Sequence, residues 1–184
     1  EHRAFGFPFD QPIGRFEEAL QIITSLLRTG HCDFHGRFFD IHDLALEPRG
    51  PRPAGPPILI GTLATGQRML RLTAQYADLW NGWLGYGRSW PDVLPPLREA
   101  IDGACVRWGR DPGTLGRTIA VRVALLGQEV GDGVEPLTGT PAEIAEAFRA
   151  YARGGVTHMQ VWLVPNDLAG VEAFGAVLEE LDRG

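Results

Sequence analysis

Residues 56–83 read PPILIGTLATGQRMLRLTAQYADLWNGW, and this stretch decides the fold of the chain. The apolar run Ile58–Ile60 predicts a short strand covered on both faces, as parallel strands usually are. Gly61–Gly66 predicts a tight turn, Gln67–Tyr76 an amphipathic helix and Ala77–Asn81 the next buried strand. Strand, small-residue loop, helix and strand make one βαβ step, with an anion site where the loop meets the helix amino terminus.

The rest of the sequence alternates helices and strands in the same way. Helices are expected at Arg15–Thr29, at Leu97–Trp108, from Pro141 to Gly154 and at Leu168–Leu181, strands at Ile119–Leu126 and Val156–Val164, and a small hairpin at Cys32–Ile41. The helix that begins after Thr140 is the best marked, because residues 140–143 form a capping box with proline at the first helical position. The order βαβαβαβα implies a parallel sheet with right-handed crossovers.

Composition limits the classes of function. The chain has 184 residues, enough for one domain, and its net charge of −6 without a basic stripe predicts no nucleic-acid partner. No apolar run reaches 18 residues, which predicts no membrane partner. Cys32 and Cys105 form no CxxC motif, so we expect a cytoplasmic protein without disulfides. All 17 basic residues are arginine, which excludes lysine Schiff-base chemistry.

Three segments of the chain, residues 1–6, 56–62 and 71–81, resemble the luciferase-like monooxygenases. Members of that family are oxidoreductases that use flavin or deazaflavin on a TIM-type (β/α)8 barrel. The resemblance therefore implies an α/β fold, FMN or deazaflavin (coenzyme F-420) as cofactor and a small organic molecule as substrate. It corresponds to about the last four βα units of the barrel. We expect residues 1–184 to form a single luciferase-like domain that lacks its N-terminal half.

A half-barrel has a physical problem, because four parallel strands cannot close and leave two unpaired edges. We therefore expect a homodimer. Two other functions stay open at this point. One is a non-catalytic half-barrel that acts as a binding or structural subunit. The other is a phosphate-binding TIM-barrel lyase or isomerase, against which the lack of lysine and of paired catalytic carboxylates argues.

The candidate cofactor-binding residues in the loop are Gly61, Thr62, Ala64, Thr65 and Gly66. The resemblance implies that the amides of this loop hold the cofactor phosphate. The family segment usually reads Ile-Gly-Gly-Ser-Gly, and here Thr62 replaces its second glycine. Threonine offers a hydroxyl, but it adopts positive φ less readily than glycine. The alternative is a tight βα turn with no ligand.

Asn81 falls at the carboxyl end of its strand, the catalytic face of a barrel, where we expect it to bind cofactor or substrate. Capping of a loop is the alternative. Trp83, Tyr86 and Trp90 follow on the next loop. Aromatic side chains there cover a flat ring or an apolar substrate, or else pack the loop or a subunit contact.

The run from His158 to Leu163 alternates, so that His158, Gln160 and Trp162 face the barrel lumen. We predict Gln160 and Trp162, together with Trp83, as substrate-binding residues. For His158, deeper in the barrel, a hydrogen bond inside the core is the expected role.

Arg122 lies mid-strand with Ala120 and Ala124 beside it, and these small neighbours leave room for its side chain. A buried arginine needs a carboxylate or another anion. We expect a structural ion pair, with a substrate anion as the alternative. Arg117, just before the strand, is expected to be solvated.

His31, Asp33 and His35 share one face of a predicted strand, and Cys32 lies on the other. A closed metal site needs a fourth ligand, so we expect no metal and an exposed hairpin. No general acid, base or nucleophile motif stands out, and the catalytic residues stay unknown. That pattern is typical of enzymes in which the cofactor carries the chemistry.

Overall fold

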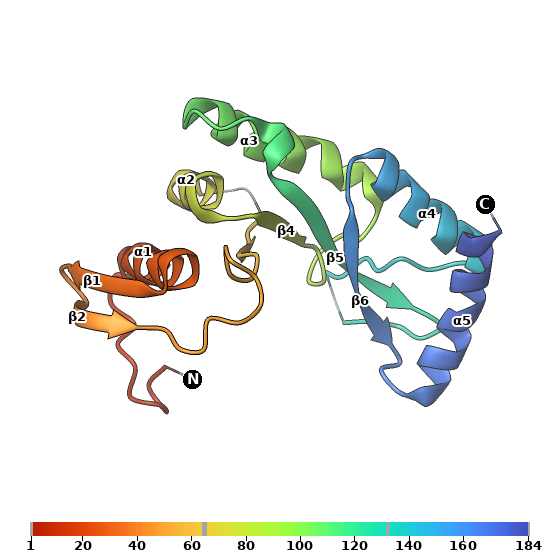
Figure 1. Cartoon of the computed structure of the whole chain (residues 1–184). Coiled ribbons are helices and arrows are strands. Elements are labelled where there is room, and N and C mark those ends of the chain that lie inside the picture. The colour runs from red at the N-terminus through yellow and green to blue at the C-terminus, as the bar shows by residue number, and fades with distance from the viewer. Residues whose placement is uncertain (1, 64–65, 132, 184) are drawn as a thin grey trace. The chain divides into compact units, whose positions relative to one another are not determined.

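The computed structural model describes residues 2–63, 66–131 and 133–183 (Figure 1). Its contacts divide the chain into two compact units, residues 1–58 and residues 59–184. Within the described ranges, no helix is long and apolar enough to cross a membrane. The predicted loop residues Ala64 and Thr65 lie outside the described part of the chain.

The first unit holds one helix and one hairpin: α1 (Pro12–Thr29), β1 (His31–His35) and the antiparallel β2 (Asp40–Ala45). The helix begins three residues earlier than expected, because a proline suits the first helical turn. It ends at Gly30, whose φ of +82° is the left-handed conformation that glycine adopts at helix ends.

The hairpin turn is fastened to the helix by one carboxylate. The backbone N–H groups of Arg37, Phe38 and Phe39 donate to the Glu18 carboxylate at 2.8, 2.8 and 3.1 Å. These bonds satisfy turn amides that no strand partner could reach.

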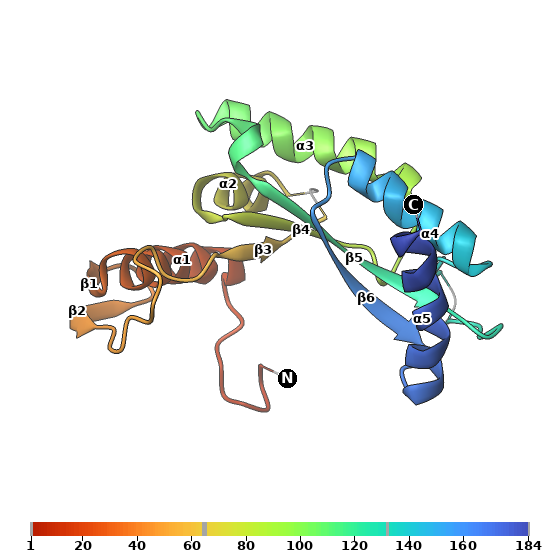
Figure 2. The same ribbon diagram turned by 45° about the vertical axis from the view of Figure 1, so that its right-hand side comes forward.

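The second unit consists of four βα units. They are β3 (Leu59–Gly61), α2 (Gln67–Tyr76), β4 (Leu79–Trp83), α3 (Leu94–Arg107), β5 (Gly116–Ala124), α4 (Pro141–Arg153), β6 (His158–Val164) and α5 (Leu168–Asp182), with short 3-10 turns at Pro91–Val93 and Pro112–Thr114. The strands are parallel in the order β3-β4-β5-β6, as the alternating pattern predicts. The helices α2–α5 lie on one side of the sheet (Figure 2).

The two faces of the sheet differ in character. Trp80, Ile119, Val121 and Val123 are completely buried and form the core on the helix side. On the opposite face, pairing brings Trp83 beside Ala120 and Ala120 beside Gln160, and it places Arg122 beside Trp162. We call this second surface the inner face.

Two boundaries differ from the sequence prediction for a clear reason. The helix α3 begins at Leu94 instead of Leu97, because Pro95 and Pro96 fall in its first turn, where an N–H has no helical partner to lose. The strand β4 begins at Leu79 instead of Ala77, because the Ala77 N–H still caps α2 by donating to Thr73 O at 3.0 Å.

The capping box predicted from residues 140–143 is confirmed. Thr140 N–H donates to the Glu143 carboxylate at 2.7 Å, and Glu143 N–H donates to Thr140 Oγ1 at 3.3 Å. The backbone N–H of Thr140 holds the pKa of Glu143 below its ordinary value. This reciprocal pair fixes where α4 starts.

Arginine side chains fasten the turns that lead into the strands. Arg110 Nη1 donates to Ala74 O at 3.1 Å and to Ala77 O at 2.6 Å, and Arg98 Nη1 donates to Gly154 O at 2.8 Å. Arg117, predicted to be solvated, is instead buried in β5, where it pairs with Asp102 and donates to Leu115 O. The prediction was wrong because β5 starts at Gly116, ahead of Arg117.

Gly170 and Gly175 in α5 provide a matched pair for testing the packing of the last helix. A Cβ added at Gly170 would lie 2.0 Å from Pro165 O, whereas one at Gly175 would meet nothing within 4 Å. We expect Gly170→Ala to lower the free energy of unfolding by about 1–3 kcal/mol. Gly175→Ala should raise it by up to about 1 kcal/mol, because alanine is the better helix former. Urea denaturation of both variants measures the difference, and equal effects would contradict the packing described here.

Candidate functional site

The strand ends of the second unit meet at one edge of the sheet, because all four strands are parallel. At this edge the loop after β3 is tied to β4. Thr62 N–H donates to Asn81 O at 3.0 Å, and the indole N–H of the buried Trp80 donates to Thr62 O at 2.9 Å. The Thr62 backbone is thus held by the sheet.

The glycines of this loop leave the backbone open. Neither needs a positive φ: Gly66 is extended at φ −105°, and a Cβ at Gly61 would meet only Asn81 O at 3.9 Å. A Cβ at Gly66 would meet only Met69 Cβ, at 4.0 Å. Packing against the described residues therefore does not require glycine at either position. Glycine at Gly66 suits its place as the helix N-cap, and at both positions the backbone has room for the close approach of a ligand.

Gly66 is also the N-cap of α2, and no side chain caps the helix there. The first-turn amides of the ten-residue helix therefore point toward the loop with the positive end of the helix dipole. Such an arrangement suits a phosphate.

Asn81 is half-buried on the inner face and is held from the neighbouring strand. Thr118 Oγ1 lies 3.1 Å from Asn81 Oδ1 and 3.1 Å from Trp80 O. The carboxamide of Asn81 thus lies at the same sheet edge as the Gly61 end of β3, with which Asn81 is in register.

An aromatic cluster covers the inner face above Asn81. The rings of Trp83 and Trp162 are stacked with centroids 5.9 Å apart, and Tyr86 meets their edges at 5.7 and 5.8 Å. Trp162 and Gln160 lie on this face, as the strand alternation predicts. Trp90 does not join the cluster. It lines a separate cavity together with Pro91 and residues 138–139.

A mostly apolar pocket of about 530 Å³ opens beside this cluster. Its walls include Leu63 from the loop after β3, Trp83 and Tyr86 from the region after β4, and Leu97 from α3. The volume lies within the range of pockets that hold small ligands. The pocket therefore places an apolar surface next to the phosphate-type loop.

Arg122 differs from its prediction. It is 8% exposed, yet it forms no ion pair with any residue in the described ranges. Its guanidinium instead lies over the Trp162 ring, 3.9 Å from the centroid, and 5.6 Å from that of Tyr86. The expected structural ion pair was wrong, because strand register brings Trp162, and the loop after β4 brings Tyr86, to the side chain where a carboxylate was expected.

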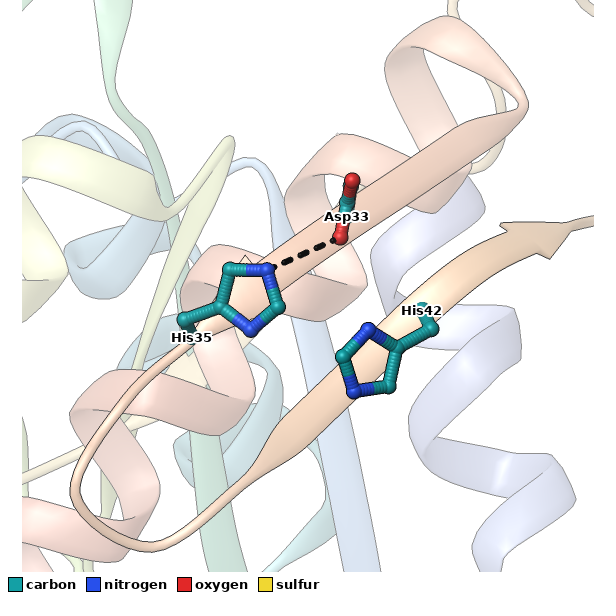
Figure 3. A group of neighbouring side chains, drawn as sticks. All are labelled: Asp33, His35 and His42. Atoms are coloured by element: carbon teal, nitrogen blue, oxygen red, sulfur yellow. Dashed lines mark ion pairs between the residues drawn. The ribbon is translucent and has the colours of Figure 1, made fainter.

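The hairpin gathers a polar cluster that sequence reasoning identified only in part. Figure 3 shows Asp33 and His35 on β1 facing His42 on β2, with candidate ligand atoms all within 4.8 Å of one another. Asp40 adds contacts at 2.6 Å to His35 and 3.1 Å to His42. All these side chains are exposed, and the two carboxylates contact the two imidazole rings.

Two of the residues weighed for a metal site do not join this cluster. His31 contacts Asp43 at 2.8 Å instead, and Cys32 is buried on the other face of β1. His42 and Asp40 were missed because they lie on the partner strand, and only the strand register brings them to His35.

Comparison with known proteins gives this geometry a context. The family model described as luciferase-like monooxygenase matches residues 1–128, more than half of the chain. The chain belongs to the luciferase-like monooxygenase family. The resemblance predicted from the sequence motifs is therefore confirmed.

Two relatives illustrate the range of proteins that the chain resembles. A phthiodiolone/phenolphthiodiolone dimycocerosates ketoreductase of Mycobacterium kansasii is 30% identical over 173 residues, which cover 91% of this chain and 44% of the relative. The pyrimidine monooxygenase RutA of Methylorubrum extorquens is 35% identical over 109 residues, 57% of this chain and 28% of RutA. The chain thus spans less than half the length of these relatives.

Solved structures establish the fold. An F420-dependent secondary alcohol dehydrogenase matches 98% of this chain with a TM-score of 0.74 at 13% identity, and the chain covers 66% of it. The monooxygenase RslO1 from Streptomyces bottropensis matches 99% of this chain with a TM-score of 0.75 at 15% identity, and the chain covers 64% of it. The predicted fold class is confirmed: the chain is α/β, with a parallel sheet that forms part of a TIM-type barrel.

The hairpin cluster leads to a prediction about the pH dependence of stability. The hydrogen bond between His35 and Asp40 raises the pKa of His35 and lowers the pKa of Asp40. Because the pKa of His35 is raised in the folded state, its bond to Asp40 stabilises the fold fully at pH values below the pKa of His35 in the unfolded chain. This stabilisation is lost as the pH rises through the folded-state pKa. The Asp40 contribution is lost as pH falls through its own lowered pKa.

We expect an NMR titration to place His35 above its ordinary pKa of 6.5 and Asp40→Asn to bring it back toward that value. Asp43→Asn is the matched control, because Asp43 contacts His31 on the same hairpin. A His35 pKa that ignores Asp40→Asn, or that responds equally to both variants, would contradict the assignment.

Proposed function

We propose that this chain belongs to an oxidoreductase that uses a flavin (FMN) or a deazaflavin (coenzyme F-420) to transform a small organic substrate. The family supports an oxidoreductase, and the ketoreductase, the F420-dependent dehydrogenase and the monooxygenases among the similar proteins name the kinds of chemistry involved. A reduced flavin activates oxygen, and a reduced deazaflavin transfers hydride.

The sheet edge is the observation that carries this proposal. The backbone has room for a ligand at Gly61 and Gly66, and Gly66 is the N-cap of α2. Thr62 between them, whose backbone is bonded to β4, offers its side chain. These residues would hold the cofactor phosphate. The predicted Ala64 and Thr65 belong to the same loop and remain part of the proposal.

The remaining roles follow from position. Asn81 would hydrogen-bond cofactor or substrate, since its carboxamide is fixed by Thr118 next to the loop. Trp83, Trp162 and Gln160 would contact the substrate on the inner face, where the two indoles are stacked. The apolar pocket beside Trp83 offers room for a flat ring or an apolar substrate.

Location and assembly complete the proposal. Both cysteines are buried and unpaired with each other, which fits a reducing cytoplasm. The outer strands β3 and β6 of the described sheet each have one neighbour only, which favours a homodimer. Analytical ultracentrifugation tests this assembly, and a monodisperse monomer would contradict it.

Gly66→Asp tests the phosphate site directly. Aspartate is a better N-cap than glycine, and its Cβ has room, so the fold should be kept while the carboxylate repels a phosphate. We expect the dissociation constant for FMN or F420 to rise at least about tenfold, which is about 1.4 kcal/mol. Titration of each cofactor with fluorescence detection measures it.

Gly66→Asn is the matched control, because asparagine has the same shape and caps the helix without a charge. Its affinity should stay within a few-fold of the unmodified protein. Equal affinities of the Asp and Asn variants would remove the loop from the site. Failure of both FMN and F420 to bind the unmodified protein would remove the proposed function.

A further inference from the structure

Arg122 is the one buried cation of the inner face whose charge is not matched within the described ranges. Its neighbours on the same face of β5 are Ala120 and Ala124, and Arg122 is 8% exposed. Trp162 covers one face of the guanidinium at 3.9 Å from the ring centroid. Tyr86 approaches it at 5.6 Å.

The backbone of Arg122 is satisfied, but its side chain is not. Arg122 N–H donates to Ser89 Oγ at 3.0 Å, and Arg122 O accepts from Leu137 N–H at 2.9 Å. Its Nε is buried and has no hydrogen-bond partner among the described residues. A buried guanidinium donor without a partner is unfavourable unless an anion reaches it.

A second unsatisfied polar group lies on the same face. Gln160 Oε1 is buried without a hydrogen-bond partner among the described residues. Gln160 precedes Trp162 by two positions on β6, so both side chains point to the inner face beside β5. Two unsatisfied polar side chains next to an aromatic cluster indicate a place built for a ligand with a polar end.

We propose that Arg122 binds a carboxylate carried by the substrate, with the apolar or aromatic body of that substrate against Trp162 and Tyr86. Trp162 lies over the guanidinium, and Nε is a buried donor without a partner among the described residues, so we place the ligand at the edge that bears Nε. A planar carboxylate matches that edge with two parallel N–H···O bonds. Naming this carboxylate as substrate rests on the proposed function, whereas the binding site itself does not.

Sodium benzoate is the probe, and benzamide is its neutral counterpart of nearly the same shape. Binding next to Trp162 changes tryptophan fluorescence, which a titration of the purified protein follows. We expect benzoate to bind at least tenfold more tightly than benzamide. Arg122→Gln should abolish this preference, and Arg122→Lys should reduce it, because lysine keeps the charge but loses the planar fork.

Arg71→Gln is the matched control. Arg71 also lies over an indole, 5.7 Å from the Trp108 ring, but on α2 at the other side of the sheet. This variant removes one positive charge and one arginine–tryptophan contact while leaving the inner face unchanged. The benzoate preference should persist in it. Circular dichroism confirms folding of each variant, and Arg122→Lys decides the case if Arg122→Gln does not fold.

Three outcomes would overturn the proposal: equal binding of benzoate and benzamide, a benzoate preference that survives Arg122→Gln, or displacement of benzoate by equimolar inorganic phosphate. The last would assign the position to a phosphate group. Cofactor titrations on the same variants separate this proposal from the proposed function. If the protein prefers benzoate but binds neither FMN nor F420, the carboxylate site stands and the proposed oxidoreductase function is rejected. If it binds a cofactor but shows no preference for benzoate, the proposed function stands and the carboxylate site is rejected.

Discussion

The parallel register of β4, β5 and β6 is the constraint on which the candidate site depends. Ala120 is paired with Trp83 on one side and Gln160 on the other, and Arg122 is paired with Trp162. Because side chains alternate along a strand, a slip of one residue would turn Arg122 into the helix-packed core. The completely buried Ile119, Val121 and Val123 prevent that slip, since each would then face the inner side. The core thus fixes the site.

Local signals in the sequence were enough to locate most elements. The helix Gln67–Tyr76 was predicted to the residue, and the capping box at Thr140 placed the start of α4. Prediction failed where tertiary contacts extend an element past its local signal. The strand β5 begins at Gly116 because pairing with β4 and the Asp102 carboxylate stabilise Arg117 inside the sheet.

The alternation of side chains along a strand predicted which face of the sheet the candidate site residues occupy. That rule placed Gln160 and Trp162 on the inner face and Arg122 in a buried position. It could not identify the neighbours of Arg122, because Tyr86 and Trp162 come from other segments of the chain. The hairpin shows the same limit: His42 and Asp40 meet His35 through cross-strand register, which no spacing in the sequence records.

Arg98 and Arg110 each bind the backbone of a turn that leads into a strand. These contacts affect which segments of the chain can vary in evolution. Because their partners are backbone carbonyls, these contacts remain possible when the side chains of the turns are substituted. Insertions there would separate guanidinium from carbonyl. At the opposite strand ends Arg88 instead ties the loop after β4 to the loop after β5 through the side chain of Glu135. Substitutions in the turns that enter the strands therefore leave the arginine contacts in place, whereas an exchanged loop at the ligand-facing end has to keep or replace the Arg88–Glu135 pair.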